Sequence, residues 1–523
     1  MIDRILTVGA YTLASRVTGF LRDVVMAAVL GAGPVADAFL VAFRLPNHFR
    51  AIFAEGAFSA AFVPAYARIR TQGGPEPARL FADRIFTLLL VTQLGLLALA
   101  LAFTPAVIRV LAPGFESDPG RFALATALTR VTFPYLLAMT LVALYGGMLN
   151  ALDRFAAAAA APILLNLTMV AALALAALFP SAGHAAAWGV LIAGGLEVAL
   201  LAGSTARADV LPKFRRLAWD ADVRRFFVAL GPAAIGSGGI QLALFADTII
   251  ASFLPAGAIS ALYYADRLNQ LPIGVIGIAV GTVLLPEMSR RIAAGDEDGA
   301  RQAQSRAIEF TLLLSLPCLA AFLVVPDLIL RALFTRGAFT AADAAAAGAT
   351  LAAYALGLVP FVLIRSVVAT FFARGDTATP VKAALIAVPV NIAFKLLLMG
   401  PFAQVGLALA TTIGAWINFG LVLWFGARRG YIRRDPDLAR AVVKLAAAGL
   451  ALALMLWLAQ RPALALFAGW GGARDLLALA ALVAVGAAVY VGIVLALFGR
   501  QWLEQLRRRR AAADRPPPDL PVE

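Results

Sequence analysis

The chain has 523 residues, of which 62% are hydrophobic and only 14% are charged, and its formal net charge is +14. Soluble domains carry about 25% charged residues, so this composition excludes an ordinary soluble protein. Apolar stretches of 18 residues or more recur along the whole chain, which is typical of a protein that crosses a membrane many times. The basic residues gather in the loops between these stretches, so the net charge does not indicate a nucleic-acid partner.

The hydropathy pattern predicts an all-α polytopic membrane protein with about fourteen transmembrane helices. Each predicted span is long enough to cross about 30 Å of hydrocarbon at a rise of about 1.5 Å per residue. In chain order we expect the spans at residues 5–30, 35–66, 84–111, 124–150, 157–179, 185–205, 225–254, 259–288, 306–334, 345–373, 379–399, 403–427, 441–459 and 475–499.

Successive loops along the chain are alternately rich and poor in Lys and Arg. One set of loops, with the two termini, carries about 30 of the 44 Lys and Arg residues, which places that side in the cytoplasm by the positive-inside rule. Both termini are then cytoplasmic, as an even number of spans requires. We therefore expect a multi-pass membrane protein with both ends on the cytoplasmic side.

An internal repeat organises the spans into two halves. A shift of about 223–226 residues places Ala42–Leu45 on Ala265–Leu268, and Phe86–Leu90 on Phe310–Leu314. Each half then holds six spans of the same orientation, which is the plan of transporters whose site lies between the halves near the membrane midplane. We expect a first six-helix lobe at 1–216, a second at 217–434, two additional helices within 435–500, and a basic, proline-rich disordered tail at 501–523.

Charged side chains interrupt the first, second and eighth predicted spans, where each costs about 2.5–3.5 kcal/mol to insert. They are Arg16, Arg22, Asp23, Asp37, Arg44, His48, Arg50, Glu55, Asp266 and Arg267. Guanidinium groups bind two phosphate oxygens at once, so the arginines predict a midplane cavity selective for a phosphate-bearing anion. The alternative is that the arginines only pair with Asp23, Asp37, Asp266 and Glu55 to hold the helices together.

Asp247 lies in the seventh predicted span with no basic residue near it in sequence. An intramembrane carboxylate of this kind suggests a sodium or proton site, to which Asp376 and Asn391 could add oxygens. Hydrogen bonding to Thr248, Ser252 or another helix is the alternative. The two histidines have no metal-site spacing, and no loop carries a catalytic constellation, so we expect a transporter that requires no cofactor and not an enzyme.

The motifs that surround these charges resemble the MurJ/MviN family, the lipid II flippases of the multidrug/oligosaccharidyl-lipid/polysaccharide exporter superfamily. The resemblance covers the first twelve spans. The residues that carry it are Ser15–Val17, Gly19-Phe20, Arg22-Asp23, Gly31–Gly33, Ala36–Phe39, Arg44–Asn47, Arg50, Phe53–Ser59, Tyr263–Leu268 and Thr379–Lys382.

The resemblance implies a multi-pass protein of the bacterial plasma (inner) membrane, with a central cavity that opens alternately inward and outward. It implies that the cargo is lipid II, undecaprenyl diphosphate carrying the MurNAc-pentapeptide-GlcNAc unit, moved to the outer leaflet for peptidoglycan assembly, with membrane lipids and peptidoglycan polymerases as partners. It assigns substrate binding to Arg16, Arg22, Arg50 and Arg267, with Asp23, Asp37, Glu55 and Asp266 as acidic neighbours. It also implies sodium at Asp247 and a lipid-tail groove in the last two helices.

Two other transport functions stay open on the residues alone. One is a flippase for another polyprenyl-diphosphate glycan, which the charges do not distinguish from lipid II. The other is a cation-coupled multidrug exporter of the same superfamily, whose pocket should be acidic or aromatic, whereas the predicted cavity is rich in arginine. A membrane glycosyltransferase or a passive scaffold is disfavoured by the lack of catalytic residues and by the polar midplane.

Overall fold

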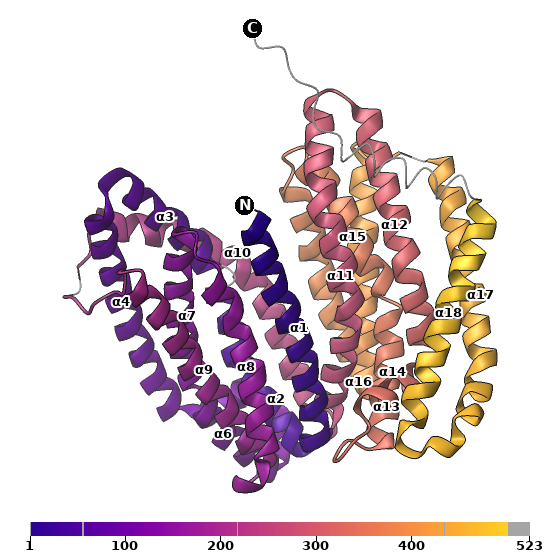
Figure 1. Cartoon of the computed structure of the whole chain (residues 1–523), viewed down its shortest axis with the longest axis horizontal. Helices are drawn as coiled ribbons and strands as arrows, with labels where there is room; N and C mark the ends of the chain where they lie inside the picture. The colour runs from indigo at the N-terminus through magenta and orange to yellow at the C-terminus, as the bar shows by residue number, and fades with distance from the viewer. Residues whose placement is uncertain (1, 55–56, 217, 434, 500–523) are drawn as a thin grey trace. The chain divides into compact units, whose positions relative to one another are not determined.

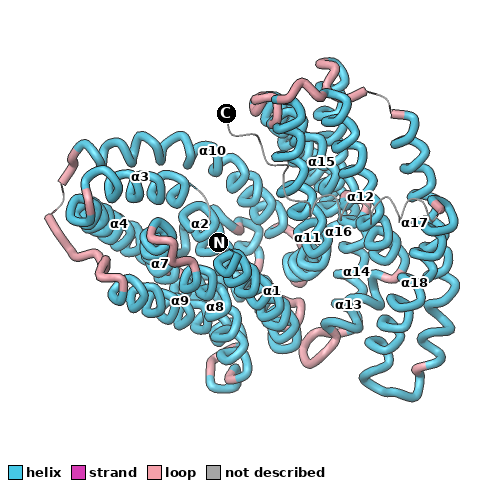
Figure 2. The backbone as a smooth tube through the Cα atoms, turned by 45° about the horizontal axis from the view of Figure 1, so that its top comes forward, coloured by secondary structure: helices cyan, strands magenta, loops and turns pink. Residues whose placement is uncertain are grey.

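The computed structural model describes residues 2–54, 57–216, 218–433 and 435–499, and within these ranges it contains helices and loops but no strand (Figures 1 and 2). The chain folds into two compact units. The first unit comprises residues 1–264, 334–346 and 399–404, and the second comprises 265–333, 347–398 and 405–523. The all-α prediction is confirmed.

The helices up to the start of the second repeat are α1 (Ile2–Leu30), α2 (Pro34–Ala54), α3 (Ala57–Gly73), α4 (Pro75–Ala102), α5 (Thr104–Leu111), η1 (Pro113–Ser117), α6 (Pro119–Thr132), α7 (Pro134–Ala151), α8 (Ala156–Ala174), η2 (Ala176–Leu178) and α9 (Ala182–Arg207). They are followed by α10 (Ala221–Ser252), α11 (Ala258–Ala293), α12 (Glu297–Val324), α13 (Pro326–Phe334), α14 (Ala341–Ala355), α15 (Leu358–Phe372), α16 (Ala378–Arg428), α17 (Pro436–Leu466), η3 (Ala468–Ala473) and α18 (Arg474–Phe498).

Several predicted spans are broken into two helices. The predicted span 84–111 overlaps both α4 and α5, and 124–150 overlaps both α6 and α7. Pro134 begins α7 and has no N–H to donate to the preceding turn, which interrupts the hydrogen bonding between α6 and α7. The predicted spans 379–399 and 403–427 correspond to the two arms of α16, which meet at a kink where Ala403 has non-helical backbone (φ 47°, ψ −127°).

The internal repeat is visible in the helix bounds. A shift of 222 residues carries α4 onto the bounds of α12, and carries the start of α5 onto the start of α13. The starts of α6 and α14 are separated by the same shift. The two halves therefore place their helix breaks at equivalent positions, whereas the lobe and tail boundaries that we expect from the sequence stay a prediction.

Nine helices or helix pairs in the described ranges are long and apolar enough to cross a membrane. The nine do not include α1, α2, α10 and α11, which hold the charged residues of the predicted cavity and Asp247, and each of these four helices contains side chains outside the described parts of the structure.

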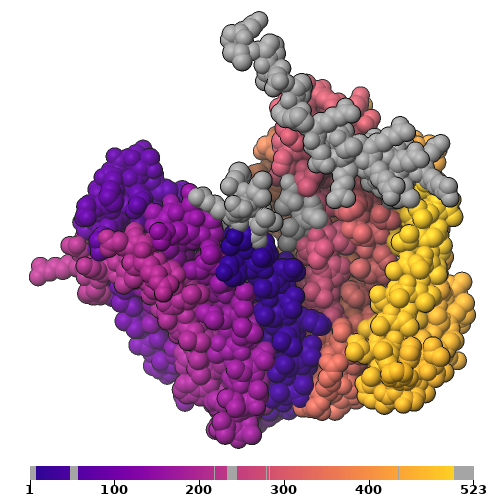
Figure 3. All heavy atoms as spheres, in the orientation of Figure 1, coloured from indigo at the N-terminus to yellow at the C-terminus, as the bar shows by residue number. Residues whose placement is uncertain are grey.

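Aromatic packing forms a core in the first unit. Phe62 lies at the centre, with its ring 5.2 Å from that of Phe58 and 5.7 Å from that of Phe81. Phe226 of α10 packs edge-on against Phe58 at 5.7 Å, so α10 is fixed against α3. Beside this core α1 packs along α8, as the indigo and magenta surfaces in Figure 3 show. In the second unit α17 and α18 pack together and α17 lies against α12.

Candidate functional site

Arg22 of α1 is buried and is held by a network of polar side chains. Its Nε and Nη2 atoms donate to Oδ1 of Asp23 at 3.1 and 2.7 Å, and its Nη1 donates to Oδ1 of Asn166 at 3.1 Å. The hydroxyl of Tyr263 donates to the same Asp23 oxygen at 2.9 Å. A buried guanidinium and carboxylate thus satisfy each other where either alone would be costly.

Asn166 orients this network on α8. Its amide nitrogen donates to the Ser15 carbonyl at 3.0 Å and to the Thr18 hydroxyl at 3.2 Å. The amide oxygen is consequently turned toward Arg22. Arg22 is therefore engaged by protein groups in this conformation, and its role in substrate binding stays a prediction.

Asp37 forms a second buried network, at the N-terminal end of α11. Its Oδ1 accepts from the backbone N–H and the hydroxyl of Ser260 at 2.9 and 2.6 Å, and its Oδ2 accepts from the Gly257 N–H at 2.7 Å. The carboxylate occupies the positive end of a helix, where anions are stabilised. Arg121, whose Nη1 lies 3.7 Å from Asp37 Oδ2, donates to the Ser252 carbonyl at 3.1 Å. Asp37 thus ties α2 to the loop between α10 and α11.

Backbone-to-backbone hydrogen bonding reinforces the same region. The Ala338 N–H donates to the Ala28 carbonyl at 2.7 Å. Gly31 has φ +68°, and a Cβ there would lie 2.7 Å from the Ala338 carbonyl oxygen. Gly337 has φ +57°, and a Cβ there would overlap the Ala28 carbonyl oxygen. Only glycine allows both the left-handed conformation and this approach, so the turn after α1 and the turn after α13 are locked together within the first unit.

Two further arginines of the first unit differ in their surroundings. The Arg44 Nε donates to the Thr248 hydroxyl at 2.9 Å, which joins α2 to α10. Arg16 is exposed and makes no ion pair with a described residue. Arg16, one of the predicted substrate-binding residues, is therefore an available cation on the described part of α1 in this conformation, whereas Arg22 is engaged.

The remaining predicted residues lie in three situations. Arg50 belongs to α2, but its side chain is outside the described parts of the structure, and Glu55 is outside the described residues altogether. Arg267 is half-buried on α11 in the second unit. Asp266, its neighbour, accepts a short hydrogen bond from the Gln270 amide. The substrate-binding assignment of these residues stays a prediction.

Asp247 is half-buried on α10. The Thr248 hydroxyl donates to the Leu244 carbonyl at 3.1 Å, and the Ser252 hydroxyl donates to the Ile249 carbonyl at 2.7 Å. Both hydroxyls thus donate to backbone carbonyls of α10 in this structure, and the choice between an ion site and a structural role for Asp247 stays open. Among the described residues no three His, Cys, Asp or Glu side chains gather as a metal site. A sodium site in a transporter also uses backbone carbonyls, and the sodium assignment at Asp247 stays a prediction.

Sequence reasoning missed Arg121 and Ser260. Arg121 is only 6% exposed, and its guanidinium lies 3.9 Å from the centre of the Phe115 ring. It falls between two predicted spans, where an arginine is ordinary, so hydropathy carried no signal. Ser260 lies in the first turn of α11, and the N-terminus of a helix can bind a carboxylate. The glycine and serine at this predicted helix start were the available signal in the sequence.

Comparison with known proteins places this geometry in a family. The family model described as "Lipid II flippase MurJ" matches residues 26–497. The "Probable lipid II flippase MurJ" of Rhizobium meliloti (strain 1021) is 41% identical over 518 residues, which cover 97% of this chain and 96% of that protein.

Solved structures agree on the fold. The structure titled "Lipid II flippase MurJ, inward closed conformation" is similar with a TM-score of 0.79 and 24% identity, over 95% of this chain and all of that one. An inward-facing multidrug resistance MATE family transporter of the MOP superfamily is similar with a TM-score of 0.65 and 15% identity, over 79% of this chain and 94% of that one. From the family model and the sequence relative together, the chain belongs to the lipid II flippase MurJ family.

Proposed function

We propose that this chain is a lipid II flippase that carries undecaprenyl-diphosphate-linked peptidoglycan precursor from the inner to the outer leaflet of the bacterial plasma membrane. Family membership supports the cargo. The observation that carries the chemistry is the buried Arg22, whose Nε and Nη2 both donate to one carboxylate oxygen. The two donors project side by side, as they must for a phosphate group with two acceptor oxygens.

The diphosphate takes the place of the Asp23 carboxylate as acceptor of the Arg22 hydrogen bonds. Asp23 keeps its hydrogen bond from Tyr263, whose hydroxyl lies 2.9 Å away, so the displaced carboxylate has a partner. Asn166 holds the guanidinium in orientation during the exchange, because its Oδ1 accepts from the third nitrogen. By this exchange Arg22 has a negatively charged partner in both states: Asp23 when the cavity is empty and the diphosphate when cargo is bound.

Arg16, Arg50 and Arg267 supply further positive charge to the diphosphate. Arg16 is exposed and makes first contact from α1, and Arg50 and Arg267 contribute from α2 and α11. The two phosphate groups carry more negative charge than one guanidinium can neutralise, which favours several arginines over one. Sodium at Asp247 is part of this proposal as a structural ion, and no transport step is assigned to it.

Alternating access requires the region around Asp37 to separate when the cargo leaves. By the charge distribution of the loops both termini are cytoplasmic, so the turns at Gly31, Gly257 and Gly337 face the outside. The hydrogen bonds from Ser260 and Gly257 to Asp37 join α2 to the start of α11 at this end, and in this proposal they break when the end opens. The inside-negative potential, worth about 2.3 kcal/mol per charge per 100 mV, favours outward movement of the anion and return of the emptied cationic cavity.

Complementation tests this function. A bacterium is depleted of its own flippase, this chain is expressed, and outer-leaflet lipid II is assayed for wild type and for Arg22→Ala, Arg50→Ala and Arg267→Ala at matched protein levels. We expect rescue by wild type and failure of the three variants. Rescue by all four would keep the flippase and remove the diphosphate site. Failure of well-inserted wild type would favour another polyprenyl-diphosphate glycan or drug export.

Two further parts of the proposal concern location and partners. The protein resides in the inner membrane with both termini in the cytoplasm, and peptidoglycan polymerases receive the flipped precursor. A cysteine introduced at the N-terminus and one in the turn after α1 should react differently with a membrane-impermeant thiol reagent. Labelling of the N-terminal cysteine in intact spheroplasts would reverse the assigned orientation.

A further inference from the structure

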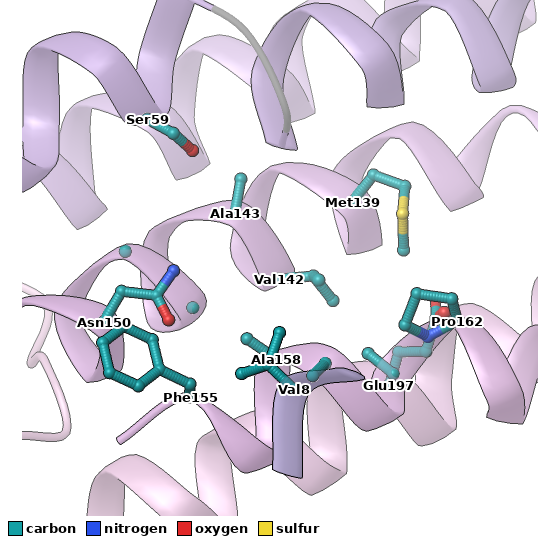
Figure 4. Close-up of a pocket in the computed structure, with 14 residues that line it drawn as sticks. Val8, Ser59, Met139, Val142, Ala143, Asn150, Phe155, Ala158, Pro162 and Glu197 are labelled. Atoms are coloured by element: carbon teal, nitrogen blue, oxygen red, sulfur yellow. The ribbon is translucent and has the colours of Figure 1, made fainter. Parts of the chain in front are cut away.

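A separate cavity of about 320 Å³ lies within the first unit, among α1, α3, α7, α8 and α9 (Figure 4). Its walls are mainly apolar, and Val8, Val142, Phe155 and Ala158 are among them. Neither Arg22 nor Asp37 lines it. Its volume is at the lower end of the range for small-molecule sites, about 300–1,000 Å³, and its mostly apolar wall with a few polar groups is typical of such sites.

Glu197 is the one charged side chain among the described residues that line this cavity. It lies on α9, near the middle of an otherwise apolar span, and is only 3% exposed. The hydroxyl of Tyr135 lies 3.5 Å from its Oε2. Asn150 and Ser59 add neutral polar groups to the wall, as Figure 4 shows. The sequence analysis did not single out Glu197, although an acidic residue inside an apolar span is a functional candidate on general grounds.

We propose that this cavity binds a small organic cation, an ammonium group carried on an apolar body. A carboxylate at the wall of a low-dielectric cavity attracts a positive charge far more strongly than it would in water. The cavity is too large for a bare metal ion to fill, and its apolar wall favours a ligand that also buries hydrocarbon. The Phe155 ring and the Met139 thioether are groups that accommodate ammonium and apolar ligands.

This site is distinct from the arginine site in both sign and position. The lipid II proposal concerns an anion and the residues around Arg22, whereas this cavity presents a carboxylate. The cavity touches α1 at Val8, the same helix that carries Arg16 and Arg22. An occupant would therefore hold α1 against α8, and bound cation should slow flipping without competing for the diphosphate.

The test uses purified full-length protein in lipid nanodiscs with benzyltrimethylammonium as the probe. Binding is followed by saturation-transfer NMR of the probe and by the thermal unfolding temperature. Three variants accompany wild type. Glu197→Gln removes the charge, Ala158→Leu fills the cavity and keeps Glu197, and Glu116→Gln removes an exposed carboxylate that pairs with Arg109 and does not line the cavity.

We expect saturable binding to wild type and to Glu116→Gln, and at least tenfold weaker binding to Glu197→Gln and Ala158→Leu. Equal binding by all four proteins would overturn the proposal, as would the absence of saturable binding to wild type at millimolar probe. If Glu197→Gln fails to fold by size exclusion, Ala158→Leu decides, because it changes the cavity and leaves the carboxylate in place. Lipid II flipping by Glu197→Gln is measured separately without the probe, so that a failure of the cation site can be distinguished from a failure of the lipid II proposal.

Discussion

The Asp37 carboxylate oxygen Oδ1 lies 2.6 Å from the hydroxyl oxygen of Ser260, although the two residues are 223 positions apart in the chain. The same oxygen accepts the Ser260 N–H. The buried Asp37 carboxylate thereby accepts hydrogen bonds from donors at the start of α11 and joins this helix to α2. Removal of the carboxylate would leave buried donors without an acceptor, which costs about 1–3 kcal/mol for each such group.

A double-mutant cycle on Asp37 and Ser260 should show strong coupling. We expect Asp37→Ala to lower the unfolding temperature markedly, Ser260→Ala to lower it less because the backbone N–H bonds remain, and the double variant to be little worse than Asp37→Ala. The coupling energy should lie within about 0.5–3 kcal/mol. Thermal unfolding in detergent measures it, and the exposed pair Arg109 and Glu116 is the control cycle. Additive effects at Asp37 and Ser260 would contradict a shared hydrogen bond.

Arg22→Lys should impair flipping more than Arg16→Lys. Lysine keeps the charge but cannot donate to Asp23 through two nitrogens and to Asn166 through a third, as Arg22 does. Each hydrogen bond to a charged group is worth about 1.5–3 kcal/mol, so we expect at least a tenfold loss of flipping rate. Arg16 is exposed and unpaired among the described residues, so a point charge should serve there.

Rates of fluorescent lipid II translocation in proteoliposomes give the comparison, at equal reconstituted protein. An equal loss in both variants would mean that the forked geometry of Arg22 is not used. Asn166→Ala should give an intermediate loss, because it leaves the arginine charge and removes the group that orients it.

Gly337→Ala should destabilise the protein more than Gly375→Ala. Both residues have positive φ, +57° and +74°, so each alanine costs about 1–2 kcal/mol for the left-handed conformation. A Cβ at Gly337 would also overlap the Ala28 carbonyl oxygen, whereas a Cβ at Gly375 meets nothing within 4 Å. The difference in unfolding temperature between the two variants isolates the contact between the turns, and equal temperatures would show that the close approach is not maintained.

The sequence predicted the fold because its signals are periodic and long. Hydropathy marked the long helices, and matched motifs such as Ala42–Leu45 and Ala265–Leu268 predicted the repeat that the helix bounds display. Arg22 and Asp23 could be named as a polar cluster because they are neighbours in one helix. Their partners Asn166 and Tyr263 could not, because pairing across more than 140 residues depends on how the helices pack.

The sequence analysis also passed over two buried charged residues, Arg121 and Glu197. Arg121 is an ordinary loop arginine by sequence, yet it is buried against Phe115 and bonds to the Ser252 carbonyl. Glu197 is a single acidic residue in a long apolar run, and only the cavity around it gives it a role. In both cases the information lies in burial, which one sequence without three-dimensional contacts does not contain.

Sodium should stabilise wild type through Asp247 and not through Asp376. A ligand that binds only the folded protein raises its stability by RT ln(1 + [L]/Kd), so the unfolding temperature should rise with sodium concentration at constant ionic strength when choline is replaced. Asp247→Asn should abolish the rise. Asp376→Asn should preserve it, because this carboxylate already accepts from the Thr379 N–H and pairs with Arg429. Loss of the sodium effect in Asp376→Asn alone would place the ion at the start of α16. An unfolding temperature of wild type that does not change with sodium would remove the sodium site from the proposal.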